Sequence, residues 1–320
     1  MWPWPLWPHL GRMQTVGCIR EVRTAQKKSY AMDKRIHFLD QLRSHMMLLG
    51  VVLHVAGNYN TMPAGELWPY KDADTYGVLS VLVTFIHSFR MQVFFLVAGF
   101  FAVLLMDARG VQGYLRNRSL RILAPLLLFV LPLTLACGWL FRQGADLMAL
   151  RGVTVDFDAQ WPLYHLWFLY YLFIYCLLAL GLNGPVRTWM ASAARARRAV
   201  LALPWLLVLA LALVHGLKGS YLLDTPVDLH LVWGVFAQYG LFFLAGMVGY
   251  HGRAEFFASF ASWKRWLVLT LAALIAFVAS ASWTAKANPE NPLFHINALK
   301  SNRIKSAPRN HPECRIIIRQ

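Results

Sequence analysis

The sequence predicts an all-α, polytopic bundle of transmembrane helices with about seven spans. Of its 320 residues, 58% are hydrophobic and only 14% are charged, whereas a soluble protein of this length carries about 25% charged residues. Apolar stretches long enough to cross a bilayer recur along most of the chain, without the alternation of a membrane β-barrel. Basic loops alternate with neutral or acidic ones, which is typical of a multi-pass protein.

The apolar stretches predict spans at 41–59, 78–106, 119–141, 161–182, 199–217, 229–250 and 265–285. The loops after the second and fourth spans are rich in arginine, so the positive-inside rule places the N-terminus in the cytoplasm. The protein is expected to reside in the inner (plasma) membrane. This topology also accounts for the net charge of +16. Membrane lipids are therefore the expected surroundings, and no nucleic acid is expected as a partner.

Three regions differ in composition. Residues 1–35 read as an N-terminal cytoplasmic extension, 36–285 as the transmembrane domain and 286–320 as a polar, basic tail. Met32 directly precedes a basic segment and resembles a natural start, so 1–31 is expected to be a mis-assigned extension. Seven spans from a cytoplasmic start would place the basic tail outside, against the positive-inside rule, so we expect this tail to be disordered or frame-shifted.

The first predicted span contains two ionisable residues, Arg43 and His54. Such residues are costly inside a membrane and are usually functional. They share one helical stripe and lie about 16 Å apart along the axis. Gly50 and Gly57 on this stripe leave room for a substrate or a neighbouring helix, and Asp40 can pair with the arginine one turn away. The alternative for His54 is a histidine that only bonds to a neighbouring helix.

Further candidates lie in the next three spans. His87 and Arg90 are one turn apart and would clamp an anionic group; the alternative is an arginine that snorkels to the surface. Arg118 and Arg121 would grip phosphates, or serve only as positive-inside anchors. His165 opens an aromatic-rich span and would either face a polar acceptor such as a sugar or stay interfacial.

Two other features bear on packing and metals. Phe94–Gly99 and Phe242–Gly246 each place small residues after paired aromatic side chains, a pattern that suits close approach of helices. The four cysteines have no metal-type spacing, so no metal site is predicted.

Four segments together resemble the membrane-bound acyltransferase-3 family over roughly residues 35–285. They are FLDQLRSHMMLLGVVLH (38–54), FRMQVFFLVAGFF (89–101), RNRSLRILAP (116–125) and HLWFL (165–169). The arrangement of the last three is closest to the glucan-biosynthesis branch of the family. Family members have ten or more spans, so the resemblance implies that this chain is C-terminally truncated.

The resemblance implies transfer of an acyl group from a cytoplasmic acyl-CoA to a carbohydrate or lipid-linked acceptor. Arg43 and His54 map onto the functional pair of the family, and Arg118 and Arg121 onto its proposed acyl-CoA site. His54 is expected to act as a general base, because neutral imidazole titrates near the operating pH. Acetyl-CoA or succinyl-CoA is the expected donor, with Arg90 and His87 holding the carboxylate of a succinyl group. The alternatives are a transporter or flippase of an acylated or anionic solute, or an inactive truncated remnant.

Overall fold

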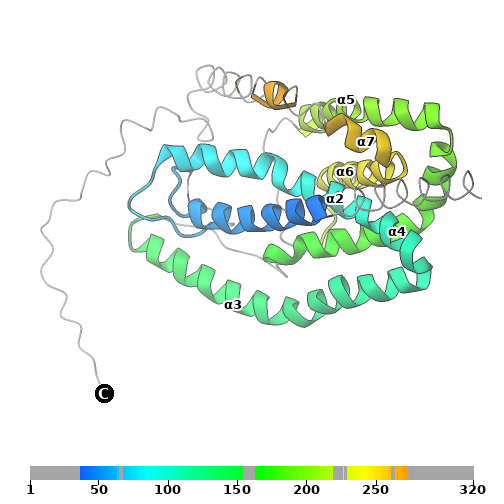
Figure 1. Cartoon of the computed structure of the whole chain (residues 1–320). Helices are drawn as coiled ribbons and strands as arrows, with labels where there is room; N and C mark the ends of the chain where they lie inside the picture. Colours follow the sequence, from blue (N-terminus) through cyan, green and yellow to red (C-terminus); the bar gives the residue numbers. More distant parts are fainter. Residues whose placement is uncertain are drawn as a thin grey trace, which may run out of the picture.

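The computed structural model describes residues 37–62, 64, 68–153, 163–218, 226, 229–260, 264, 266–271 and 275. These residues form an all-helical bundle without β-strands (Figure 1). The all-α prediction is therefore confirmed for the described part of the chain. The predicted N-terminal extension 1–35 and the tail 286–320 lie outside these residues.

The chain begins, where it is described, with a helix over residues 37–57. The elements that follow are α2 (Gly77–Arg118), a π-helical turn η1 (Ser119–Leu123), α3 (Ala124–Ala149), a 3-10 turn η2 (Tyr164–Leu166), α4 (Trp167–Met190), α5 (Ala193–Lys218), α6 (Trp233–His251) and α7 (Arg253–Phe260). Of the last predicted span, 265–285, residues 266–271 and 275 are described and are helical.

The predicted loop between the second and third spans is wrong, because α2 continues through it into η1 and α3. Residues 107–118 contain no proline and several good helix formers, so charge alone does not end the helix. The chain bends at Gly110, whose φ of 67° and ψ of 176° are available only to glycine. The π-helical turn lies just before Pro125, which has no N–H for the carbonyl of Arg121.

Two neighbouring predictions also shift. Of the arginines assigned to the loop before the fifth span, Arg187 lies in the last turn of α4, and the other three lie in α5, which begins at Ala193. Residues 253–260 form the short helix α7 rather than a loop, since Phe256 is buried against Gly249 of α6. In both cases the helix includes a polar segment that also has a buried apolar face.

The centre of the fold is the pairing of α2 with α6. The two helices run parallel, because Phe95 packs on Tyr239 with ring centroids 4.9 Å apart, and further along Asp107 accepts a hydrogen bond of 3.0 Å from Tyr250. At the level between them, a side chain on Gly99 or Gly246 would collide with the backbone of the other helix. The close approach predicted from the two small-residue segments is confirmed.

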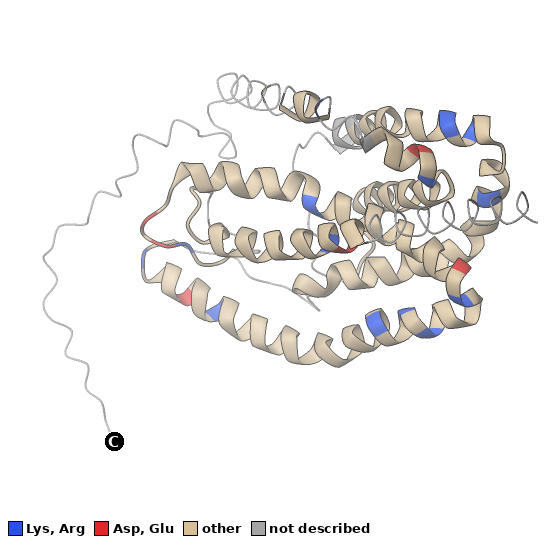
Figure 2. Cartoon of the chain, viewed as in Figure 1, with Lys and Arg blue, Asp and Glu red and all other residues tan. Residues whose placement is uncertain are grey.

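Large apolar side chains remain exposed along the outside of the bundle. On α3 they are Leu127, Leu128, Leu131, Leu135 and Trp139. Within the described residues, two helical stretches, Gly77–Ala149 and Tyr164–Met190, are long and apolar enough to cross a membrane by length and composition. Lys and Arg gather at the end of the bundle where α2 passes into α3 and α4 into α5, as Figure 2 shows.

Candidate active site

The helix over 37–57 lies antiparallel to α2, and this pairing positions the candidate site. Arg43 of this helix contacts Phe101 of α2, with the guanidinium 5.7 Å from the ring centroid. Further along, Gly50 faces Arg90, and Leu53 packs in one cluster with Ile86. Along these contacts the residue numbers of the 37–57 helix rise while those of α2 fall. His54 therefore lies at the level of residues 86–90 of α2.

His54 meets His165, which lies in the 3-10 turn η2 directly before α4. The Nδ1 atom of His54 lies 3.4 Å from the Nε2 atom of His165, within hydrogen-bond range, and the rings meet edge to face with centroids 4.3 Å apart. Tyr164, directly before His165, has a φ of 42°, an uncommon conformation for a bulky residue. Its buried ring packs on Phe141 with centroids 5.1 Å apart, so the surroundings hold this strained backbone in place.

Arg90 approaches the histidine pair from α2. Its guanidinium occupies the space beside Gly50, where any side chain would collide with it. Its Nε atom is buried and has no hydrogen-bond partner. Arg90 interacts electrostatically with His54 and His165, and also with Tyr239 of α6, while His87 acts on His54 from one turn earlier. A half-buried cation with an unused N–H is suited to binding an anion or a developing negative charge.

The loop after the 37–57 helix covers the other side of His54. Trp68 packs on the His54 ring, with centroids 5.8 Å apart, and lies directly against Gly57. Lys71 is buried and donates to the carbonyl of Gly57 at 2.5 Å and to Oδ1 of Asn60 at 2.7 Å. It thereby caps the helix C-terminus. Burial lowers the pKa of Lys71 to about 8.

Beneath the polar residues lies an aromatic floor. Tyr239 is buried between Phe95 and Trp167, and its ring centroid is 5.5 Å from that of Trp167. Gln238 is also buried, and neither its Oε1 nor its Nε2 atom has a hydrogen-bond partner; the same is true of Oε1 of Gln92 on α2. Polar groups of this kind are costly to bury without a partner.

Arg43 and Arg118 form a second, separate group around Phe101. Arg118 donates from Nη2 to the carbonyl of Phe101 at 3.2 Å, and its guanidinium lies 5.3 Å from the ring centroid of Tyr114. The side chain of Arg43 is 44% exposed and pairs with Asp40 at 3.4 Å, which is the predicted ion pair. Arg121 is exposed, because the π-helical turn places it on a different side from Arg118.

The predicted residues thus fall into two groups. His54, His87, Arg90 and His165 come together, and Arg43 and Arg118 meet at Phe101. Sequence reasoning missed Trp68 and Tyr239. Gly57 has no side chain, which indicated that another side chain could pack against it. The sequence did not indicate that this side chain is Trp68. Among the residues that the structure describes, no three His, Cys, Asp or Glu side chains gather as a metal site.

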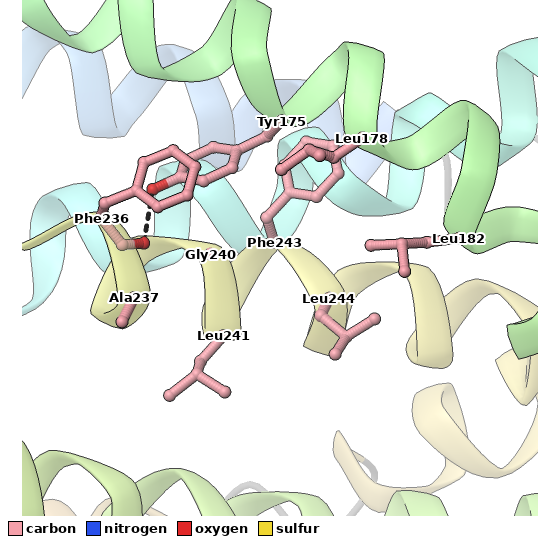
Figure 3. Close-up of a pocket in the computed structure, with 9 residues that line it drawn as sticks. All are labelled: Tyr175, Leu178, Leu182, Phe236, Ala237, Gly240, Leu241, Phe243 and Leu244. Atoms are coloured by element: carbon pink, nitrogen blue, oxygen red, sulfur yellow. Dashed lines mark hydrogen bonds between the residues drawn. The ribbon is translucent and has the colours of Figure 1, made fainter. Parts of the chain in front are cut away.

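An apolar groove of about 320 Å³ lies elsewhere, between α4 and α6 (Figure 3). Its polar groups are already satisfied, because the Tyr175 hydroxyl donates to the carbonyl of Phe236 at 2.7 Å. The remaining lining side chains are aliphatic or aromatic. None of the predicted site residues lines this groove, so the chemistry is to be sought at the histidine pair.

Comparison with known families decides which chemistry this is. A family described as "Acyltransferase domain", of the acyltransferase-3 type, matches residues 36–298. The chain belongs to the acyltransferase-3 family. The resemblance drawn from the four sequence segments is thereby confirmed.

Several curated relatives of this chain are named Glucans biosynthesis protein C, among them those of Salmonella paratyphi B, Salmonella heidelberg and Salmonella paratyphi A. Each is 30% identical over 153 residues, which cover 46% of this chain and 39% of the relative. The match therefore spans about two fifths of the length of these relatives. No solved structure matches the chain.

Proposed function

We propose that this member of the acyltransferase-3 family is an integral membrane O-acyltransferase. It moves an acetyl or succinyl group from acyl-CoA to a hydroxyl of a carbohydrate, such as a glucan of the cell envelope. The observation that carries the proposal is the His54 imidazole, held by His165 and Trp68 beside the cation Arg90, in a chain of an acyltransferase family. Acyl transfer needs a base for the attacking hydroxyl and a donor of positive charge for the carbonyl oxygen.

In the proposed reaction, His54 takes the proton of the acceptor hydroxyl as its oxygen attacks the thioester carbonyl carbon. The negative charge that develops on the carbonyl oxygen is stabilised by Arg90, whose Nε–H has no partner. The C–S bond then breaks as the carbonyl reforms. The departing CoA thiolate takes the proton from the His54 imidazolium, which restores the neutral base.

Arg43 and Arg118 are proposed to hold the donor at the other end of the site. The Arg43 guanidinium lies over the ring of Phe101 and that of Arg118 donates to its carbonyl, so both can offer positive charge to the phosphates of CoA. Arg43 and His54 are eleven residues apart on one helix, which corresponds to about 16 Å. The linear pantetheine arm of CoA would lie along this helix and carry the thioester from the phosphates to His54. Arg121, exposed nearby, adds to the positive field.

If the acyl group is succinyl, Arg90 and His87 would also bind its distal carboxylate. The distal carboxylate of succinyl-CoA is an anion at a fixed distance from the thioester, and the half-buried Arg90 guanidinium is a suitable partner for it. An acetyl group has no such carboxylate. The relative rates with the two donors therefore indicate whether Arg90 also selects the acyl group.

The membrane location rests on surface chemistry. The exposed leucine and tryptophan side chains of α3 suit a lipid environment better than water. The arginines at the α2–α3 and α4–α5 turns mark one end of the bundle, which the positive-inside rule assigns to the cytoplasm (Figure 2). Arg43 and Arg118 would then face cytoplasmic acyl-CoA, and His54 would lie toward the opposite, outer surface.

The acceptor is proposed from two observations. The curated relatives carry the name Glucans biosynthesis protein C. In this chain, Trp68 packs beside His54, and aromatic faces suit the apolar faces of sugars. A glucan oligosaccharide is therefore the acceptor to test first.

The test is release of free CoA by the purified protein in lipid nanodiscs, followed with a thiol-reactive chromophore. Acetyl-CoA or succinyl-CoA is the donor, and a soluble glucan oligosaccharide is the acceptor. We expect acceptor-dependent CoA release and a matching mass increase of the oligosaccharide. Thioester hydrolysis that ignores the oligosaccharide would contradict the acceptor, and an intact thioester with either donor would contradict the acyl-CoA reaction.

A further inference from the structure

The contact between His54 and His165 uses particular nitrogen atoms. Nδ1 of His54 faces Nε2 of His165 at 3.4 Å. When both rings are neutral, these two facing nitrogens share one proton, and the direction of the hydrogen bond fixes the tautomer of each ring. If His54 donates, its Nε2 atom carries a lone pair. If His165 donates instead, Nε2 of His54 carries the proton and has no lone pair with which to act as a base.

We propose that His165 is the positioning residue of the site, which accepts a hydrogen bond from Nδ1–H of His54 and so holds Nε2 of His54 as the base. The inference rests on the proposed acyl transfer. His165 touches neither donor nor acceptor in this role. It fixes the His54 tautomer before the reaction and stabilises the imidazolium while the proton is held, as a hydrogen-bond acceptor does for the histidine of other acyl-transfer sites.

The surroundings of the two rings favour this role. His54 lies between Trp68, with centroids 5.8 Å apart, and His165, with centroids 4.3 Å apart, so its ring has aromatic neighbours on two sides. His165 follows Tyr164, whose strained backbone is held by its buried ring. The pair is thus pre-arranged by rigid neighbours, which is what an orienting contact requires.

The exposure of His165 fits the proton arrangement as well. His165 is an exposed residue, whereas His54 is half-buried. With Nε2 accepting from His54, the proton of His165 resides on Nδ1, where water can accept it. Arg90, the nearby cation, can only donate hydrogen bonds and so cannot replace His165 as the acceptor.

Two substitutions separate this role from simple packing. The side-chain amide of glutamine reaches the position of histidine Nε2, whereas that of asparagine reaches the position of Nδ1. Because His165 uses Nε2, His165→Gln keeps an acceptor oxygen near His54 and is expected to stay within about tenfold of the wild-type kcat. His165→Asn is too short and is expected to lose about 100-fold in kcat, with the KM for acetyl-CoA unchanged.

His45→Asn is the matched control, since His45 is exposed on the same helix as His54 and bonds only to the carbonyl of Gln41. It is expected to leave kcat unchanged. Equal losses in His165→Gln and His165→Asn, with both proteins folded as judged by thermal unfolding, would overturn the proposal. So would wild-type kcat in His165→Asn.

A second readout does not depend on activity. The ¹⁵N chemical shifts of histidine-labelled protein distinguish protonated from unprotonated ring nitrogens, and His54→Asn assigns the His54 signals. We expect Nδ1–H with bare Nε2 for His54 in the wild type, and a mixture of tautomers in His165→Asn. A proton on Nε2 of His54 in the wild type would refute the pairing. If the expected tautomer is found but no variant releases CoA, the pairing stands and the proposed acyl-CoA reaction fails.

Discussion

Gly246→Ala tests the packing of α2 on α6, which supports every residue of the site on those helices. A methyl group at Gly246 would fall on the carbonyl oxygen of Leu96, with the amide nitrogen of Phe100 only 2.8 Å away. Ordinary contact begins at 3.4 Å. Both obstructing atoms belong to the backbone of α2, so no side chain can rotate away and the helices must separate.

The expected magnitude combines two opposing terms. Overpacking of this kind costs about 1–3 kcal/mol, and the backbone obstruction favours the upper limit. Replacing glycine by alanine inside a helix contributes about 1 kcal/mol in the stabilising direction. We therefore expect Gly246→Ala to lower the free energy of unfolding by about 2 kcal/mol.

Gly181→Ala is the matched control, because Gly181 lies inside α4 and a methyl group there meets nothing within 4 Å. It should stabilise the protein by up to about 1 kcal/mol. Both variants are measured by equilibrium unfolding in mixed micelles with increasing denaturing detergent, followed by tryptophan fluorescence. A Gly246→Ala protein as stable as Gly181→Ala would refute the close approach of α2 and α6.

Three further predictions concern the site and its covering loop. Folding lowers the pKa of Lys71 from 10.5 to about 8, so the unfolded state binds more protons between these values and stability should rise with pH across that window, by up to about 3 kcal/mol. Lys71→Met should abolish this rise in unfolding experiments between pH 7 and 11, and an unchanged slope would contradict the burial of the charge. Gly50→Ala should push the flexible Arg90 guanidinium away and lower kcat by about 10- to 100-fold without loss of fold, which initial rates and thermal unfolding check together; a wild-type rate would argue against a role for Arg90. Arg43→Ala should raise the KM for acetyl-CoA about tenfold at nearly constant kcat, and a fall in kcat with constant KM would show that Arg43 acts on the reacting groups instead.

The helices and their closest contact were predictable from local pattern. Apolar length indicated most helices, and the small residues at Gly99 and Gly246 indicated where two of them meet. The bend at Gly110 was not predictable in the same way, because a charged segment without proline is compatible with both loop and helix. The predicted ends of the helices were wrong where polar residues follow an apolar stretch and no helix-breaking residue intervenes.

The site was predictable only in part, because its contacts join distant segments. His54 and His165 are 111 residues apart, and neither carries a local signal for the other. Gly50 and Gly57 indicated free space on the His54 stripe, but not that Arg90 and Trp68 occupy it. The grouping of Arg43 with Arg118 likewise depends on Phe101, which sequence reasoning treated only as an apolar residue.

The central claim is that His54 is the base of acyl transfer, and the initial rate of CoA release by His54→Asn tests it most directly. Asparagine retains an amide near the position of Nδ1, so the contact with His165 and the fold are kept, while the base at Nε2 is removed. The account predicts a rate lower than that of His45→Asn by about 10²- to 10⁴-fold, with both proteins equally stable. A rate within about twofold of the His45→Asn control would contradict it.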